Sequence, residues 1–467
     1  MIERWLILVG IILTLLTCMK NHNSLINNKH LNIRKVGKII LIQVGFFCFT
    51  LFCNAQKNVP SKPRIIVSTD IGGTDPDDNQ SMIHLLMYSD KVLIEGLISS
   101  PSYGDGSKKE ILRMIDLYEK DYPVLQQHSR HLLTPQYLRS VTKQGQKGGS
   151  PFRGYSSSTE GSDWIIRCAN KVSENPLWVL VWGGLDDVAQ ALHDAPEIQN
   201  KIKVYWIGGP NKKWSANSYA YIVSNFPDLW FIEVNSSYYG FFSDNQNPDM
   251  VKHSNYYVNN IQGSGNLGSD FKKYYGGSIK MGDTPSLLYM MDGDPNDPSR
   301  DSWGGSFEKI RKSPRVIYNK PTSILDTVAF CTILEFRFKG PKLEIPKYIK
   351  CFEMEIPYGN SSQIWPGYYN GNGEYVIRYI PKKAEVLNYK FNSEIKEIDS
   401  LQGSIVIDNS WPGKESNSDY QLGNNWYTDK SGEEFYDGVL QGAKTIKKWK
   451  SEVLSDWSKR WGWLKFN

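Results

Sequence analysis

Cysteine is scarce in this chain of 467 residues, which holds six. Three of them fall within the first 55 residues, so the rest of the chain keeps only Cys168, Cys331 and Cys351. Three cysteines allow at most one bridge. The sequence therefore excludes a small fold held together by disulfides, and we expect buried thiols.

An excess of charge of one sign is also missing. The formal net charge is +5, but the first 55 residues hold six basic residues and one acidic residue. Beyond them, 48 basic residues stand against 48 acidic ones. Without a basic footprint, the sequence argues against nucleic acid or an anionic membrane as a partner. The 15 Trp, 27 Tyr and 18 Phe are compatible with a sugar ligand.

Long apolar runs are absent too. Residues 5–18 and 39–53 are apolar runs, each shorter than the roughly 20 residues of a membrane-spanning helix. The second run follows three basic residues and ends in Cys-Asn-Ala, a pattern typical of a bacterial signal peptide. We expect residues 1–55 to be a leader and the protein to be exported, periplasmic or extracellular. Membrane contact is expected only through an uncleaved leader. The first run is either an anchor or precedes the true start.

Residues 61–325 alternate β-branched runs with amphipathic ones. This alternation predicts an α/β domain with a mainly parallel open sheet covered by helices on both faces. Strands are expected at 64–69, 92–99, 177–182, 202–207 and 229–234, and helices at 79–88, 108–119, 163–172 and 186–193.

The pattern changes over residues 326–425, where short strand candidates are separated by Gly, Asn and Pro without a helix between them. Such spacing predicts a small antiparallel β-sandwich. Residues 436–461 then return to helical periodicity with an apolar stripe. Because a lone helix cannot bury that stripe, we expect residues 432–467 to pack back on the α/β domain, which makes the sandwich an insertion.

The most informative stretch is Asp-Ile-Gly-Gly-Thr-Asp-Pro-Asp-Asp at 70–78. It follows a strand and precedes a helix, at the sheet edge where open α/β folds bind ligands. Its carboxylates, Asp70, Asp75, Asp77 and Asp78, would repel one another unless a cation neutralised them. Oxygen ligands alone favour Ca²⁺ or Mg²⁺, and a bound ion leaves one carboxylate free as a base. The alternative is an Asp-rich turn that caps a helix.

Several segments together resemble the nucleoside hydrolases. Residues 70–78, the strand–turn–helix at 177–196 and the strand that ends in Ile-Gly-Gly at 207–209 come in that family's order and spacing. Other segments resemble the cellulose-binding nucleoside-hydrolase-like subfamily, and residues 330–408 resemble the small sandwich module in front of some bacterial glycoside hydrolases. The segments similar to the subfamily include 135–140, 225–233, Gly-Asp-Thr-Pro-Ser at 282–286 and Trp-Gly-Gly-Ser-Phe at 303–307.

The resemblance implies a calcium site. Asp70, Asp78 and Asp283 match the calcium-ligating carboxylates, and Asp186 falls where the family offers a main-chain carbonyl. Asp77 matches the base that takes a proton from the attacking water.

The resemblance also implies where a sugar would bind. Glu233 and Asn235 match contacts to sugar hydroxyls, and Asp105 lies near a family Asn with a similar role. Trp303 is a fourth candidate for substrate binding. One departure concerns the leaving group, because Gly282 stands where many nucleoside hydrolases have a His that protonates it.

From these features we predict an exported, calcium-dependent hydrolase of an N- or O-glycosyl bond. Its substrate would be a glycan, a glycoconjugate or a nucleoside. One alternative is a non-catalytic protein that binds a cellulose-like polysaccharide. Another is a surface protein that binds a partner through an inactive enzyme fold. The sequence does not determine the oligomeric state.

Overall fold

The computed structural model describes residues 62–101, 103–104, 106–242 and 255–465. The predicted leader and Asp105 lie outside these residues. No helix in the described ranges has the length and apolar character needed to cross a bilayer.

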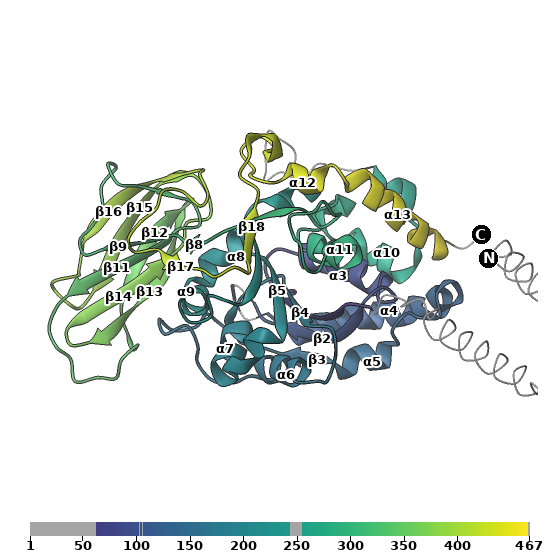
Figure 1. The fold of residues 1–467 in the computed structure, drawn as a ribbon, viewed down its shortest axis with the longest axis horizontal. Coiled ribbons are helices and arrows are strands. Elements are labelled where there is room, and N and C mark those ends of the chain that lie inside the picture. Colours follow the sequence, from purple (N-terminus) through teal and green to yellow (C-terminus); the bar gives the residue numbers. More distant parts are fainter. Residues whose placement is uncertain (1–61, 102, 105, 243–254, 466–467) are drawn as a thin grey trace, which may run out of the picture. The chain divides into compact units, whose positions relative to one another are not determined.

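A mainly parallel sheet forms the first part of the fold (Figure 1), as the sequence predicts. Its strand order is β3-β2-β1-β4-β5-β6-β18-β7, and only β7 runs antiparallel to its neighbour. The strands are β1 (Arg64–Thr69), β2 (Leu93–Ser99), β3 (Thr142–Gln144), β4 (Leu177–Val181), β5 (Ile202–Ile207), β6 (Trp230–Val234), β7 (Phe307–Lys309) and β18 (Trp426–Asp429).

Helices cover both faces of this sheet (Figure 1). Alternate residues of a strand point to opposite faces. Ile66 and Val179 pack with α6, α7 and α9, whereas Ile65 and Leu180 pack with α3, α4, α11 and α13. The α-helices are α3 (Asp77–Met87), α4 (Lys108–His128), α5 (Pro135–Ser140), α6 (Glu160–Ala169), α7 (Asp186–Asp194), α8 (Gly209–Trp214), α9 (Ala216–Asn225), α10 (Gly265–Phe271), α11 (Thr284–Asp292), α12 (Lys444–Lys447) and α13 (Lys450–Trp463). Shorter helical turns are η1 (Pro196–Asn200), η2 (Ser237–Phe241), η3 (Tyr257–Ile261), η4 (Tyr275–Gly277) and η5 (Glu433–Phe435).

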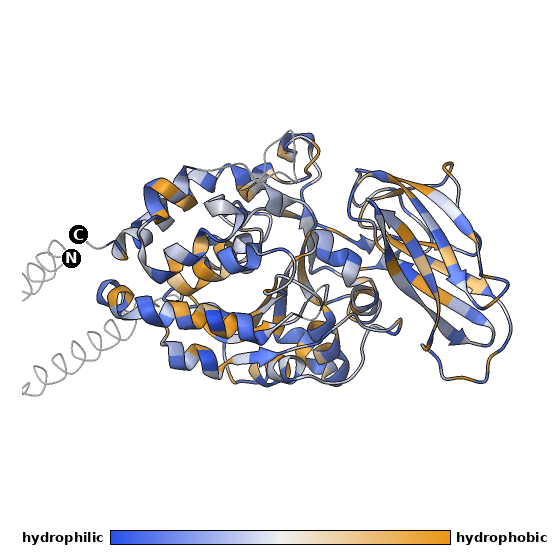
Figure 2. Ribbon diagram, turned by 180° about the vertical axis from the view of Figure 1, so that it is seen from behind, coloured by the Kyte–Doolittle hydropathy of each residue, from blue (hydrophilic) through white to orange (hydrophobic). Residues whose placement is uncertain are grey.

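The β-module, residues 315–408, is an eight-stranded sheet in the order β10-β16-β15-β12-β13-β14-β11-β9. Three strands separate β15 from β11, yet Tyr389 and Phe336 on these strands have ring centroids only 5.0 Å apart. The sheet therefore folds over an aromatic core, and colours alternate along its strands in Figure 2. Its strands are β9 (Arg315–Tyr318), β10 (Thr327–Ala329), β11 (Ile333–Lys339), β12 (Lys350–Tyr358), β13 (Ser361–Gly371), β14 (Glu374–Tyr379), β15 (Glu385–Ser393) and β16 (Gln402–Asp408); β8 (Lys312–Ser313) pairs with β17 (Tyr420–Gln421) beside it.

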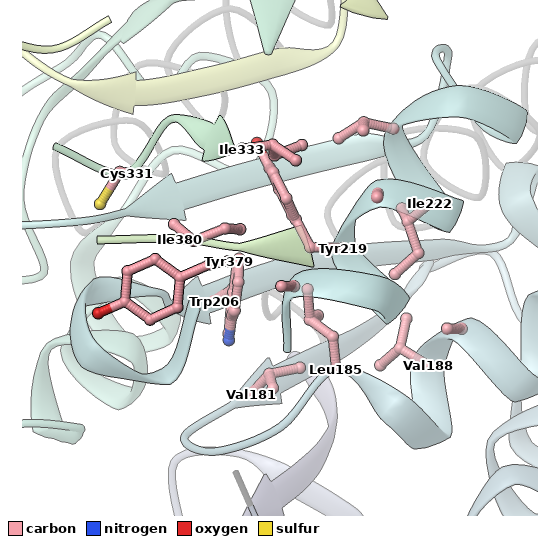
Figure 3. Packing of buried hydrophobic residues seen from close by; sticks show 14 of the residues in the cluster. Val181, Leu185, Val188, Trp206, Tyr219, Ile222, Cys331, Ile333, Tyr379 and Ile380 are labelled. Atoms are coloured by element: carbon pink, nitrogen blue, oxygen red, sulfur yellow. The ribbon is translucent and has the colours of Figure 1, made fainter. Parts of the chain in front are cut away.

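The β-module and the α/β domain share a hydrophobic core (Figure 3). Cys331, Ile333 and Ile380 from the module belong to the same buried cluster as Trp206 and Tyr219. After the module, the chain re-enters the parallel sheet through β18, which lies between β6 and β7. The module is thus held on a continuous apolar interface.

The last helical segment is shorter than the sequence predicts. Helical structure begins at α12, because residues 437–440 form a turn and Gly438 and Gly442 have positive φ angles of 64° and 71°. Val439 is accordingly 59% exposed, although it belongs to the predicted stripe. Trp457 and Trp461 of α13 are fully buried with the α/β helices.

The three described cysteines are all free. Cys168 and Cys331 are buried and Cys351 is half-buried. This agrees with the expectation of thiols rather than a disulfide framework.

Candidate functional site

The site lies where the strand order reverses. β1 and β4 are neighbours, but the chain continues from β1 to β2 on one side and from β4 to β5 on the other. Ligands of open α/β sheets bind at such a switch point, beyond the carboxyl ends of the strands. Asp70 follows β1 here, and a Cβ on Gly183 after β4 would lie 2.8 Å from the Cβ of Asp70. Glycine at 183 therefore permits this close approach.

Three carboxylates meet at this edge. Asp77 and Asp78 begin α3 and Asp283 directly precedes α11, and each offers an oxygen within 4.8 Å of the others. The hydroxyl of Thr69 donates a hydrogen bond to Asp78. The helix starts thus bring together acidic groups that are about 200 residues apart in sequence.

Burial and like charge both oppose ionisation of this group. Burial raises the pKa of Asp77, Asp78 and Asp283 well above the ordinary value, and neighbouring carboxylates raise it further. The charge of Asp70 contributes to the raised pKa of all three, while Lys280 opposes the shift at Asp77 and Asp283.

The donor set fits a hard divalent cation. Oδ2 of Asp283 is buried without a hydrogen-bond partner, so this group keeps an acceptor oxygen that is available to a ligand. Carboxylate oxygens without thiolate or imidazole are the ligands that Ca²⁺ and Mg²⁺ prefer. A cation at this place would compensate the repulsion that raises the pKa values.

The group opens into a cleft of about 510 Å³, within the roughly 300–1,000 Å³ typical of ligand sites. Asp70, Asp77, Asp78 and Asp283 lie in its wall. Other lining residues follow β4, β5 and β6, precede α11 or belong to the β-module, and they include Trp182, Asn211, Lys213, Trp214, Tyr238, Tyr239, Phe242, Lys280, Tyr358, Ser361, Ser362, Gln363 and Lys382.

Comparison with known families agrees with this geometry. A family model described as the cellulose-binding Sde182, nucleoside hydrolase-like domain matches residues 64–307, more than half of the chain. The chain belongs to this family. The model of a domain of unknown function (DUF5060) matches residues 332–394, inside the β-module. No curated protein matches the chain.

Solved structures with similarity include a nucleoside hydrolase-related hypothetical protein from Saccharophagus degradans that is associated with carbohydrate metabolism. It shares 20% identity over 74% of this chain and all of that one, with a TM-score of 0.45. An inosine-uridine preferring nucleoside hydrolase from Bacillus anthracis has 14% identity, coverage of 55% and 86%, and a TM-score of 0.35. A purine-preferring ribonucleoside hydrolase from Gardnerella vaginalis has 13% identity, coverage of 53% and 84%, and a TM-score of 0.33.

In this Sde182-family chain, the side chain of Asp186 lies apart from the acidic group. Its Oδ1 accepts a hydrogen bond of 2.8 Å from the backbone N–H of Ser150, and the Ser150 hydroxyl donates to the same oxygen. Burial raises the pKa of Asp186 to about 6, which these hydrogen bonds oppose. Its carboxylate thus fixes a loop and does not line the cleft.

Glu233 and Asn235 likewise face the interior. Glu233 is fully buried, forms an ion pair with the buried Lys212 and accepts a 2.7 Å hydrogen bond from Tyr219. The Asn235 side chain donates to Glu233 at 2.8 Å, and its backbone N–H donates to Asp429 at 2.9 Å. None of the residues of this polar network lines the cleft.

Trp303 is also remote from the acidic group. Its backbone N–H donates to Asp292 at 3.0 Å, at the opposite end of α11 from Asp283. A nine-residue helix is about 13 Å long. Of the predicted substrate contacts, none of the described ones reaches the cleft.

Other cleft residues were not predicted from the sequence. Lys213 and Trp214 follow β5, and Tyr238 and Tyr239 follow β6. All four could be found by treating every segment after a predicted parallel strand as a candidate part of the site. Nothing in the sequence places Gln363 near the carboxylates, because its position depends on how the β-module docks.

Gly282 stands where many nucleoside hydrolases have a His, and the structure shows what surrounds this position. A Cβ at this position would lie 2.6 Å from Oδ2 of Asp77. The Asp77 carboxylate therefore occupies the space into which a side chain at 282 would extend.

Proposed function

We propose that this protein is a calcium-dependent hydrolase of a glycosidic bond, N- or O-linked, in which water attacks an anomeric carbon. The observation that carries the proposal is the acidic group, with its unpartnered Asp283 oxygen, in the wall of a cleft at the switch point. Membership of a nucleoside hydrolase-like family supports it.

Asp70, Asp78 and Asp283 are the proposed ligands of the ion. Calcium bound there would supply the positive charge that lowers the pKa of water and attracts sugar hydroxyls. Thr69 would hold Asp78 in place through its hydroxyl, and the starts of α3 and α11 would fix the ligand positions.

Asp77 is the proposed base. It would take a proton from the attacking water while the water oxygen bonds to the anomeric carbon and the bond to the leaving group breaks. Neighbouring carboxylates would stabilise the positive charge that develops on the sugar ring. Because residue 282 is glycine, the leaving group would take its proton from solvent.

A carbohydrate is the proposed substrate, and the family's description as cellulose-binding supports this choice. The signal-peptide pattern within residues 1–55 supports export, which we propose as the setting in which the protein meets it.

The test is Asp77→Asn in the full chain. Turnover on a panel of glycans and nucleosides should fall at least about 100-fold, the usual contribution of a general base. Calcium affinity, measured by calorimetry, and the unfolding midpoint should stay close to those of the wild type. Asp297→Asn, in an exposed turn, is the matched control and should keep full activity. Wild-type turnover by Asp77→Asn would rule out this residue as the base.

The second candidate function is carbohydrate binding without catalysis. Glycine at 282 favours it, since no acid is available at this place for the leaving group. The family's description also fits it. Retention on insoluble cellulose without sugar release from any glycan, with and without calcium, would establish this function. Reproducible release that stops on chelation of calcium would exclude it.

A further inference from the structure

The cleft continues past the carboxylates onto a second wall. One part of this wall is α8, which starts immediately after β5 and ends at Trp214. The other part is the hairpin of β12 and β13, which contributes Tyr358, Ser361 and Gln363. The cleft is therefore longer than its acidic end, and its far half is built in part by the β-module.

Three aromatic rings that pack against one another support this wall. Trp214 lies between Tyr103, with centroids 4.3 Å apart, and Trp365, with centroids 4.4 Å apart. Trp365 is 7% exposed, whereas Tyr103 is 55% exposed. Tyr103 is thus the exposed member of a group of three packed rings whose innermost ring, Trp365, is buried. Tyr358, at the end of β12, is 57% exposed and lines the same cleft.

A polar group is held beside these rings. The Nζ of Lys213 donates to Oε1 of Gln363, which orients the amide of that side chain. Lys213 is only 4% exposed, and its Nζ lies 5.0 Å from the Trp214 ring centroid and 5.2 Å from that of Trp365. The same buried lysine therefore ties the β-module to α8 and positions a hydrogen-bonding group in the cleft wall.

Exposed aromatic rings with a fixed polar group suit a sugar ring. The C–H faces of a sugar can pack on an aromatic ring while the hydroxyl edge forms hydrogen bonds, and binding sites typically combine apolar walls with a few placed polar groups. Tyr103 and Tyr358 are both more than half exposed, so their rings are accessible to a ligand in the cleft.

We propose that Tyr103, Tyr358 and Gln363 form a second sugar subsite next to the acidic group. The ligand would then be an oligosaccharide or glycoconjugate of at least two rings, with one ring at the carboxylates and the next against the tyrosines. This rests on the proposed function in one respect, the placing of a sugar at the acidic end. It assigns the β-module a direct part in substrate binding.

The experiment uses the full chain carrying Asp77→Asn, so that binding is measured without turnover. A glycan array in calcium identifies bound oligosaccharides, and calorimetry then compares a bound glycan with its one-ring and two-ring fragments. Affinity should rise at least about tenfold from one ring to two. Adding Tyr103→Ala or Tyr358→Ala should abolish that rise. The matched control, Ile364→Ala, removes an apolar side chain that is 47% exposed on β13 but does not line the cleft, and it should keep the rise.

Each outcome of this experiment either supports or overturns the proposed subsite. No bound glycan, or an equal rise in the tyrosine variants, overturns it. Competition by inosine that weakens in Tyr103→Ala also overturns it, because the ring would then hold a nucleobase. If the length dependence appears but the wild type releases no sugar, the subsite stands and the hydrolase proposal fails. If the wild type releases sugar at a rate that both tyrosine variants match, the hydrolase stands and the subsite fails.

Discussion

Lys213 illustrates how one residue serves two parts of the molecule. Its side chain is buried with Nζ near the rings of Trp214 and Trp365, and Nζ donates a hydrogen bond to Gln363 of the β-module. Two effects lower the pKa of Lys213 from 10.5 to about 8: burial is the larger, and the positive charge of the nearby Lys382 adds to it. In the unfolded chain the same amine keeps its proton up to its ordinary pKa. Folding therefore releases a proton from this group between about pH 8 and 10.5.

The sign of the resulting pH dependence follows. Stability rises with pH wherever the unfolded state binds more protons, so Lys213 favours folding increasingly above pH 8. Relative to Lys213→Met, the wild type should gain about 1.4 kcal/mol per pH unit over this window, and about 3 kcal/mol in all. Urea unfolding at pH 7, 8.5 and 10 measures the difference. Lys339→Met, whose side chain is 80% exposed, should show no such trend. A difference that does not change with pH would contradict the shift.

The acidic group can be predicted from the sequence because its members follow strand ends or lie where helices begin. Asp77 and Asp78 come from one local motif, and Asp283 precedes a second helix start. Glu233 and Asn235 follow the same rule but face inward, for a reason that is not local. β18, from the end of the chain, lies beside β6, and Asp429 on β18 accepts the N–H groups of Asn235 and Ser236 at 2.9 and 2.6 Å.

At the scale of elements, periodicity predicted β1 and β5 with their observed bounds and the other long parallel strands to within one residue. Because these strands are buried on both faces, they are uninterrupted apolar runs in the sequence. The sequence does not predict β13 as one continuous strand, because Pro366 and Gly367 at its middle are typical of a turn. The final helix was predicted too long because residues 439 and 440 continue the apolar spacing across a turn.

The packing of α13 gives a prediction at this scale. Trp457 is fully buried, and its ring lies 5.0 Å from His84 and 5.7 Å from Phe271. Trp457→Ala should leave a cavity and lower the free energy of unfolding by about 3–5 kcal/mol. Denaturant titration of the two proteins measures it.

The control for this prediction is Val439→Ala, in the turn before α12. Val439 is 59% exposed, so its truncation should change the free energy of unfolding by less than about 0.5 kcal/mol. Equal effects of the two substitutions would show that α13 does not stabilise the α/β domain.

At the scale of the whole molecule, the acidic group should link calcium to stability. A ligand that binds only the folded state stabilises it by about 2.7 kcal/mol at a hundred times its dissociation constant. Removal of calcium with EGTA should therefore lower the unfolding temperature, and added calcium should restore it. The Asp283→Asn variant should lose this response, because a neutral amide replaces one carboxylate of the group. An unfolding temperature that does not respond to EGTA in the wild type would count against the metal site.

The return of the chain through β18 has a consequence for synthesis. Until residue 426 has been made, β6 has an unpaired edge and neither β18 nor α13 exists to close the domain that contains the acidic group. The entire β-module is translated in that interval, which lasts on the order of ten seconds at roughly 5–20 residues per second. The first domain in sequence is thus the last to be completed. The α/β domain that carries the acidic group is therefore complete only after α13 has emerged from the ribosome.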